Sequence, residues 1–218
     1  MNTRTKLIIV RHGQSIGNLT RTFLGHTDLD LSEMGYLQAN ATAEALKDEK
    51  IDKIYSSDLK RAYNTAKSIA NSHKLDIICN GKLREAFAGE WENQNVDHMI
   101  AHWGADFFVT EWKNGFGTFT LPGGESIRGA GERFFEGVRE ICEQNKGKTL
   151  VISSHAAVIR AFWGIISDVE WNRLAAEVPF PTNASYSVVY YENGVFTPIQ
   201  YSIDEHLHEV GITKVNLI

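Results

Sequence analysis

Short apolar runs rich in β-branched residues alternate along this chain with segments of helical periodicity. The run Lys6–Val10 is continuous rather than alternating, and so is the run TLVISS that ends at Ser154. Strands that are buried on both faces have this pattern. Strands that alternate with helices form mostly parallel sheets covered by helices on both sides. We therefore expect an α/β fold with three layers, α/β/α, around a mostly parallel central sheet.

Two further strands, IDKIYSS and LDIICN, and three helices complete this pattern. Ser32 is expected to cap a helix that runs to about Asp48, and Asp58 to cap a second one. A third helix is predicted from Glu125 to about Asn145. The expected buried sets are Met34, Leu37, Ala41 and Ala45 in the first helix, Leu59, Ala62, Tyr63, Ala66, Ile69 and Ala70 in the second, and Ile127, Phe134, Phe135, Val138 and Ile141 in the third.

The end of the chain has a different character. The runs YSVVYY and FTPIQY flank Glu192-Asn193-Gly194, a strong hairpin signal. This hairpin predicts an antiparallel edge on the sheet. No repeat or linker divides the 218 residues, so residues 1–218 are interpreted as one domain. Residues 89–124 have weak periodicity and are expected to form short helices and loops.

Composition excludes several classes of protein. The formal net charge of −5 does not fit a general binder of nucleic acid or of an anionic membrane. The first apolar run is too short for a signal peptide or a membrane span. Cys79 and Cys142 are too few for a disulfide framework, so we expect two reduced core thiols in a cytoplasmic protein.

Two predicted strands end close to a histidine. His12 follows the first strand after Arg11, and His155 follows TLVISS directly. A single histidine at a strand end is most often a satisfied core or loop residue. Ligands of parallel sheets bind beyond the carboxyl ends of the strands, so two histidines at matching ends favour a site.

Two arginines fit the same site. Arg11 at a buried strand end needs an anion, because an unpaired buried cation is costly. Arg61 lies in the first turn of a predicted helix, where a cation is unfavourable unless an anion intervenes, although a solvated arginine paired with Asp58 is the alternative. Gly13 is expected to allow a backbone turn and to leave room for a ligand.

Glu85 is the candidate general acid. Phe87 and Trp91 would partly shield its carboxyl group from water, and such surroundings raise the pKa of a carboxyl group. The alternative is an ordinary glutamate in a surface loop.

The motifs RHGQSIGN, SSDLKRAYNTA, LREAFAGEWEN, LPGGES and VISSHAAVIRAF resemble, in order and spacing, those of the histidine phosphatase superfamily, the phosphoglycerate-mutase-like group. The match spans about residues 6 to 190. The resemblance implies that His12 is the nucleophile of a phosphohistidine mechanism and that Glu85 is the proton donor and acceptor. It also implies catalysis without a metal ion or cofactor. The implied phosphate site consists of Arg11, Asn18, Arg61 and His155, with Ser15, Gly25 and Ala156 as secondary members.

The chain departs from the mutase pattern after the glutamate. Mutases read roughly E-R-H-Y-G there, whereas Glu85 is followed here by Ala-Phe-Ala-Gly. Between Glu90 and Pro122 the only lysine or arginine is Lys113, so the arginine pair that holds a second anionic group is missing. Leu24 also stands where mutases tend to have threonine, and Ala156 and Ala157 replace glycines. These departures favour a phosphatase of small phosphorylated metabolites; a phosphoglycerate mutase and a non-catalytic phospho-ligand binder are the alternatives.

Other features carry less weight. Leu24, Phe87 and Trp91 either shape the leaving-group side of the pocket or belong to the core. His98 and His102 have a helical spacing, but they lack the adjacent glutamate of a zinc protease, so no metal site is predicted. His206 and His208 are expected to be exposed residues of the tail. The oligomeric state is open, and exposed edge strands could pair in a dimer.

Overall fold

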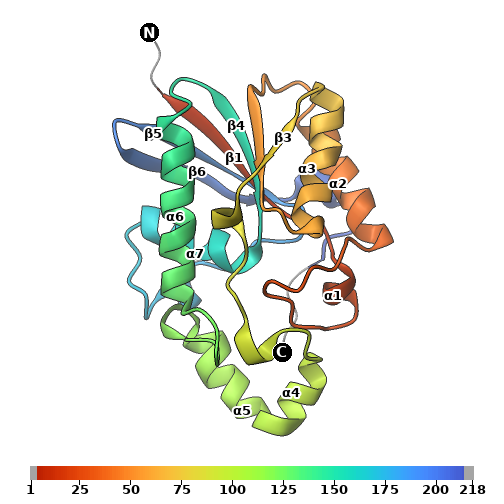
Figure 1. Ribbon diagram of the computed structural model, residues 1–218, viewed down its shortest axis with the longest axis vertical. Helices are drawn as coiled ribbons and strands as arrows, with labels where there is room; N and C mark the ends of the chain where they lie inside the picture. The colour runs from red at the N-terminus through yellow and green to blue at the C-terminus, as the bar shows by residue number, and fades with distance from the viewer. Residues whose placement is uncertain (1–3, 214–218) are drawn as a thin grey trace.

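The structure is a computed structural model that describes residues 4–213, except for the side chain of Lys113. A six-stranded sheet in the order β3-β2-β4-β1-β5-β6 forms its centre (Figure 1). Its strands are β1 (Thr5–Arg11), β2 (Lys53–Ser56), β3 (Ile77–Cys79), β4 (Thr149–Ser154), β5 (Tyr186–Glu192) and β6 (Val195–Ile203). The first four run parallel, and the hairpin β5–β6 joins β1 in antiparallel orientation. Both the mostly parallel sheet and its antiparallel edge are as predicted.

Helices cover both faces of the sheet. On β1, Leu7 and Ile9 point to one side, where α6 (Ile127–Glu143) and α7 (Ala156–Ile166) pack. Ile8 and Val10 point to the other, towards α2 (Glu33–Ala45) and α3 (Lys60–His73). This two-sided burial explains the continuous apolar run in the sequence. The three-layer prediction is confirmed.

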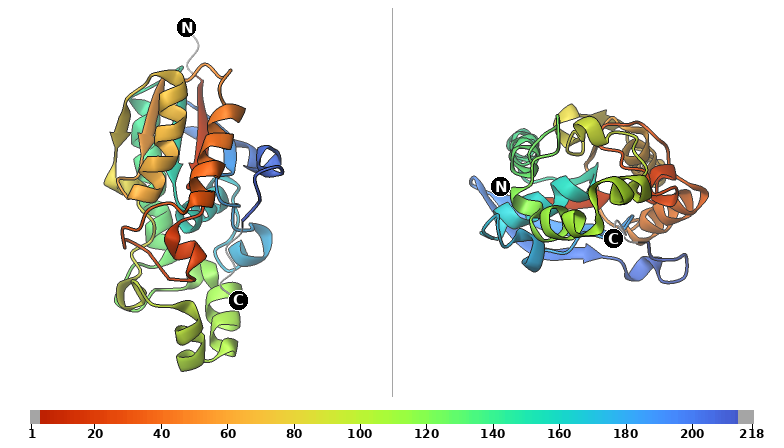
Figure 2. Two further views of the ribbon diagram at one scale, coloured as in Figure 1. Left: turned by 90° about the vertical axis from the view of Figure 1, so that its right-hand side faces the viewer. Right: turned by 90° about the horizontal axis from the view of Figure 1, so that it is seen from below.

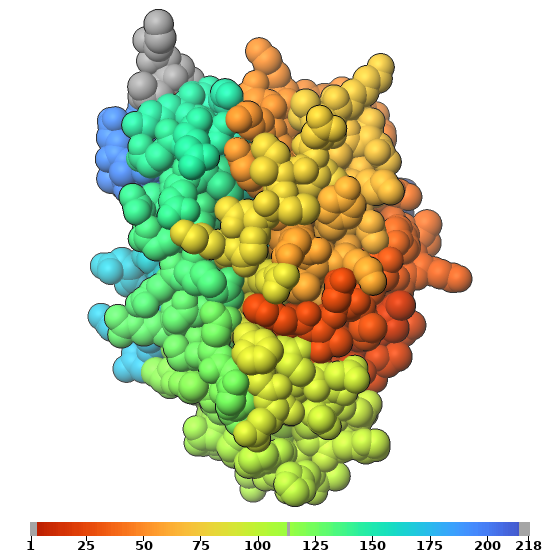
Figure 3. All heavy atoms as spheres, in the orientation of Figure 1, coloured from red at the N-terminus to blue at the C-terminus, as the bar shows by residue number. Residues whose placement is uncertain are grey.

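Residues 89–124 extend beyond the carboxyl ends of the parallel strands and form one end of the molecule (Figures 1, 2 and 3). Their helices are α4 (Val96–Trp103), α5 (Ala105–Phe107), a π-helical turn (Phe108–Asn114), and 3₁₀ turns at Gly89–Trp91 and Phe116–Thr118. Ring contacts among Trp91, Phe108, Trp112 and Phe119 build an aromatic core for this end. The remaining helices are short: α1 (Ile16–Leu19), α8 (Leu174–Glu177), and 3₁₀ turns at Gly81–Leu83 and Glu205–Leu207. None of the helices within residues 4–213 is long and apolar enough to cross a membrane.

The predicted inner face of α2 is wrong. Leu37 is 55% exposed, whereas the buried residues are Gly35, Gln38, Ala39, Thr42 and Ala43. Hydrogen bonds satisfy the buried polar side chains: Gln38 accepts from the N–H of Gln14, and Thr42 donates to the carbonyl oxygen of Ala184. Tertiary partners therefore override the apolar pattern of the helix.

Three smaller expectations are also wrong. Asp58 does not cap α3: the N-cap residue is Leu59, which forms no side-chain cap, and the Asp58 carboxylate binds Arg84 instead. Cys79 is exposed, since β3 is an edge strand. His206 is half-buried, because the chain after β6 returns over α2 and brings its Nε2 to 3.2 Å from the carbonyl oxygen of Ala184.

Candidate active site

The two strand-end histidines lie side by side. β1 and β4 are parallel neighbours with Arg11 opposite Ser154, so the next residue of each strand enters the same crevice. The backbone N–H of His12 donates to the carbonyl oxygen of Ser154 at 2.9 Å. The imidazoles of His12 and His155 meet edge to face, with their centroids 5.2 Å apart. The parallel pairing thus brings together two residues that are far apart in the sequence.

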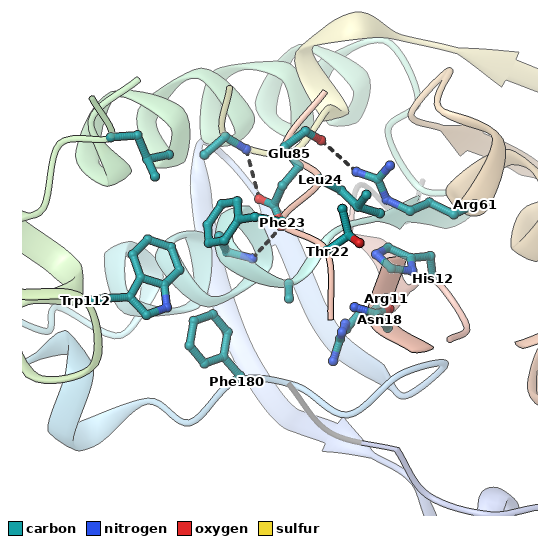
Figure 4. Close-up of a pocket in the computed structure, with 15 residues that line it drawn as sticks. Arg11, His12, Asn18, Thr22, Phe23, Leu24, Arg61, Glu85, Trp112 and Phe180 are labelled. Atoms are coloured by element: carbon teal, nitrogen blue, oxygen red, sulfur yellow. Dashed lines mark hydrogen bonds between the residues drawn. The ribbon is translucent and has the colours of Figure 1, made fainter. Parts of the chain in front are cut away.

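A pocket opens at this edge of the sheet and encloses about 630 Å³, its open mouth included (Figure 4). Most residues of the predicted site line it: Arg11, His12, Asn18, Gly25, Arg61, Glu85 and Ala156. His155 does not line it but lies fully buried behind His12, with Nε2 2.9 Å from the hydroxyl of Ser57. Ser15 is also outside the lining and caps α1.

One ring nitrogen of His12 is left free for chemistry. Nδ1 lies 2.7 Å from the carbonyl oxygen of Gly13, which can only accept, so Nδ1 carries the hydrogen and Nε2 a lone pair. Burial, with Arg61 and Arg11 nearby, lowers the pKa of His12 well below its usual value. The imidazole is therefore neutral at pH 7, the form that can act as a nucleophile.

Two buried guanidiniums border the pocket without an ion-pair partner. Arg11 donates to the carbonyl oxygen of Pro181, and Arg61 donates to those of Thr27 and Gly25. Neither arginine forms an ion pair within residues 4–213, and Nε of Arg11 has no hydrogen-bond partner there. Burial lowers the pKa of each guanidinium to about 10 while the Glu85 carboxylate opposes this, so both remain charged. Two buried cations paired only with carbonyls form a site for an anion.

The first turn after β1 orients Asn18. Ser15 and Asn18 form a capping box at the start of α1. The side-chain oxygen of Asn18 accepts from the N–H of Ser15 at 3.0 Å and from the amide of Asn183 at 3.2 Å. Both contacts occupy the oxygen, so the amide nitrogen of Asn18 is available as a donor at the pocket wall.

Glu85 lies against the N-terminus of α7. Its carboxylate accepts from the N–H groups of Ala157 at 3.0 Å and Val158 at 3.3 Å, and from its neighbour Ala86. The free N–H groups of a helix terminus are good partners for a carboxylate. The N–H of Ala156, at the first position of α7, forms no hydrogen bond with the described residues and borders the pocket.

The surroundings expected for Glu85 are not the ones found. Trp91 is 2% exposed within the aromatic core, and Phe87 is 39% exposed and packs on His26; neither residue lines the pocket. Of the three candidates for the leaving-group side, only Leu24 does.

The interpretation of Gly13 also needs correction. Gly13 does not adopt a left-handed backbone, and a Cβ atom there would lie 2.4 Å from the carbonyl oxygen of Gly35. The missing side chain therefore makes room for the first turn of α2 rather than for a ligand. Gly25 does have a positive φ of 46°, and a Cβ there would displace Glu92, whose carboxylate holds the N–H of His26.

Sequence patterns missed several residues that hold the site in place. Ser57 contacts His155, and Thr65 accepts from the N–H of Gly13 while it donates to the carbonyl oxygen of Arg61. Arg133 of α6 binds the carbonyl oxygen of Glu85. Ser57 directly follows β2, so the strand-end rule that found His12 could also have found this serine. Arg133 gives no comparable signal.

Comparisons with known proteins settle the family. Residues 7–204 match the model of the histidine phosphatase superfamily, branch 1. The chain belongs to the histidine phosphatase superfamily.

Relatives within the superfamily have different names. The chain is 33% identical to phosphoserine phosphatase 1 of Hydrogenobacter thermophilus, over 94% of this chain and 95% of that protein. It is also 33% identical to a 2,3-bisphosphoglycerate-dependent phosphoglycerate mutase of Bartonella tribocorum, over 71% and 78% of the two chains. Among solved structures, it resembles a mycobacterial glucosyl-3-phosphoglycerate phosphatase in complex with VO3, with a TM-score of 0.82 and 26% identity, over 90% and 98% of the chains. Both phosphatases and a mutase are therefore among its relatives.

Proposed function

We propose that this protein is a metal-independent phosphomonoesterase that hydrolyses small phosphorylated metabolites through a phosphohistidine at His12. The observation that carries this proposal is the neutral His12 in a pocket bordered by two buried, charged arginines. A neutral nucleophile beside two fixed cations suits attack on a phosphoryl group, because that group carries negative charge throughout the transfer.

The first half-reaction forms the phosphoenzyme. Nε2 of His12 attacks phosphorus, and the bond from phosphorus to the alcohol oxygen breaks as the new N–P bond forms. Glu85 gives its proton to the leaving oxygen, so the alcohol departs neutral. Arg11, Arg61, the amide of Asn18 and the N–H of Ala156 hold the phosphoryl oxygens, and the buried imidazole of His155 packs behind them on the ring of His12.

The second half-reaction releases phosphate. Glu85, now a carboxylate, takes a proton from a water molecule as that water attacks phosphorus. The N–P bond breaks, its electron pair returns to Nε2, and inorganic phosphate leaves. The hydrogen bonds from Ala157 and Val158 keep the carboxylate in one place for both steps. The guanidiniums supply positive charge that a metal ion provides in other phosphatases.

The pocket lining supports hydrolysis over a mutase reaction. Among the described residues that line it, Arg11 and Arg61 are the only arginines or lysines, and both belong to the proposed phosphate site. A mutase must retain a doubly charged intermediate while that intermediate reorients in the pocket. Among the described side chains no second pair of cations borders this pocket, so such an intermediate would be poorly held and would escape to solvent.

Glu85 also separates an enzyme from a protein that only binds a phosphorylated ligand. A carboxylate that faces a phosphate weakens binding by repulsion, so it is useful only where a proton has to move.

The test is turnover of p-nitrophenyl phosphate at mildly acidic pH with and without EDTA. We expect turnover that survives EDTA and that falls by about 10³-fold or more in His12→Asn. His98→Asn, at an exposed position on α4, is the matched control and should keep full activity. Full activity in His12→Asn would show that the nucleophile lies elsewhere. Phosphoglycerate mutase turnover that depends on 2,3-bisphosphoglycerate would identify a mutase.

Two wider expectations belong to the same proposal. Residues 1–218 act as one domain in which residues 89–124 form the substrate side, since Trp112 and Leu121 come from that segment and line the pocket. A reducing, cytoplasmic location agrees with the two free cysteines.

A further inference from the structure

The pocket has two chemically different halves. The inner half holds every titratable side chain among its described lining residues: Arg11, His12, Arg61 and Glu85. The outer half is apolar and is formed by Phe23, Trp112, Leu121 and Phe180, whereas Leu24 lies beside Arg61. Figure 4 shows Trp112 and Phe180 on the side of the pocket away from His12 and Arg61. A phosphate bound at the inner half would direct its organic group onto this outer wall.

The outer wall is held in one arrangement. The ring of Phe23 contacts that of Trp112 with centroids 5.3 Å apart, and Trp112 packs in turn on Phe116. Phe180 also packs on Phe116, at 4.9 Å. These ring contacts hold the apolar side chains of the outer half against one another.

A third arginine supports the wall without charging the pocket. The guanidinium of Arg160 lies 4.2 Å from the ring centroid of Phe180 and donates to the carbonyl oxygens of Val178 and Ala175. Arg160 is buried and does not line the pocket. Its charge is covered by aromatic rings and satisfied by carbonyls, so it positions Phe180 and is not free for a ligand.

We propose that the wall of Phe23, Trp112, Leu121 and Phe180 selects phosphomonoesters whose leaving group is uncharged and apolar, an alkyl or aryl alcohol. This inference rests on the proposed phosphatase function of the same pocket. A carboxylate on the leaving group would lose water against this wall without gaining a partner. An ammonium group would find only Glu85, which the reaction needs. The selectivity therefore differs from that of an enzyme for phosphoserine, a substrate that carries both charges.

The direct test compares two substrates of similar shape. Isopentyl phosphate and 3-phosphooxypropanoate differ in that an isopropyl group of the first replaces a carboxylate of the second. Both leaving groups are primary alcohols, so the difference reports recognition rather than bond breaking. We expect kcat/KM for isopentyl phosphate to be higher by about tenfold or more. Equal values, or a preference for the carboxylate, would overturn the inference.

A positive charge added at Thr22 should weaken the preference. Thr22 lines the pocket and is only partly buried, and its hydroxyl group forms a hydrogen bond with that of Thr20. Thr22→Lys places an ammonium group beside the leaving group, and Thr22→Met adds a chain of similar length without charge. We expect the first variant to raise the ratio of the carboxylate substrate to the isopentyl substrate by about tenfold. Thr22→Met should leave this ratio unchanged or lower it. A rise of the ratio in both variants would contradict the electrostatic explanation.

Binding measurements separate this inference from the proposed function. The phosphonates 4-methylpentylphosphonate and 4-phosphonobutanoate repeat the same pair but cannot be hydrolysed. Tighter binding of the first by calorimetry supports the apolar wall even if no ester is turned over, in which case the phosphatase proposal alone fails. Tighter or equal binding of the second, in an enzyme that does turn over p-nitrophenyl phosphate, refutes the wall and leaves the phosphatase proposal standing.

Discussion

The imidazoles of His12 and His155 meet edge to face, 5.2 Å between centroids, and both are buried beside positive charge. Burial, with Arg61 and Arg11 nearby, lowers the pKa of each ring well below its usual value. In the unfolded chain each imidazole regains a pKa of about 6.5. Between the two values, the unfolded state binds protons that the native state does not.

Stability should therefore fall as the pH drops below about 6.5, by about 1.4 kcal/mol per pH unit for each such histidine. The sign follows from the linkage relation, because a fall in pH stabilises the state that binds more protons, which here is the unfolded state. Urea unfolding between about pH 7.5 and 5 tests this. His155→Asn should have a shallower dependence than the wild type, whereas His98→Asn, which removes an exposed imidazole, should match it. Parallel curves for all three proteins would mean that His155 is protonated in the folded state.

A second prediction concerns the contact between α2 and the turn that follows β1. Gly13→Ala forces a methyl group to within 2.4 Å of the carbonyl oxygen of Gly35, so the backbone has to move. We expect a loss of about 1–3 kcal/mol in the free energy of unfolding, together with weaker phosphate binding, since His12 is the adjacent residue. Gly81→Ala is the control, because a Cβ there meets no atom within 4 Å. Equal stability of the two variants would show that the approach of Gly13 to Gly35 is not tight.

The third prediction tests the proton transfer. Glu85→Gln keeps the size of the side chain but cannot donate a proton. Hydrolysis of an alkyl phosphate should fall by about 10²-fold or more, and that of p-nitrophenyl phosphate much less, because the nitrophenolate leaves without a proton. Phosphate binding, measured by calorimetry, should be retained. Equal losses on both esters would assign Glu85 another role.

A fourth prediction concerns Arg133 as a positioning residue. Arg133 binds the carbonyl oxygens of Lys82, Arg84 and Glu85 and pairs with Glu125. Arg133→Met should let the Glu85 backbone shift, so kcat on an alkyl phosphate should fall by about tenfold with a smaller change on the activated ester.

Arg139→Met is the control for this variant, because it removes only an exposed ion pair with Glu136. A merely structural role for Arg133 would lower both activities of Arg133→Met in parallel, as a smaller folded fraction does.

Sequence patterns predicted the sheet well because its strands have local signatures. The continuous run in β1 and the Asn193-Gly194 turn carry their own burial and turn information. The inner face of α2 lacks such a signature, since Gln38 and Thr42 are buried through partners far along the chain, among them Gly211 and Ala184. Only tertiary contacts reveal that these polar residues can face inward.

The same distinction applies to the site. Residues at strand ends, such as His12 and His155, could be grouped from the rule for parallel sheets alone. The apolar wall could not, because Trp112 and Phe180 come from segments without strong periodicity and meet only in the folded chain. Sequence patterns therefore located the proposed phosphate site but not the wall that we propose to select the alcohol.

The most direct measurement is to trap the covalent intermediate. Glu85→Gln, mixed with ³²P-labelled p-nitrophenyl phosphate and quenched within seconds, should accumulate phosphoenzyme, because water attack lacks its base. We expect label that is stable in alkali, labile in acid and confined to the peptide that contains His12, with none in Glu85→Gln/His12→Asn. Label on His155 or on a hydroxyl or carboxyl side chain, or equal labelling of Glu85→Gln/His12→Asn, would contradict the assignment of His12 as the nucleophile.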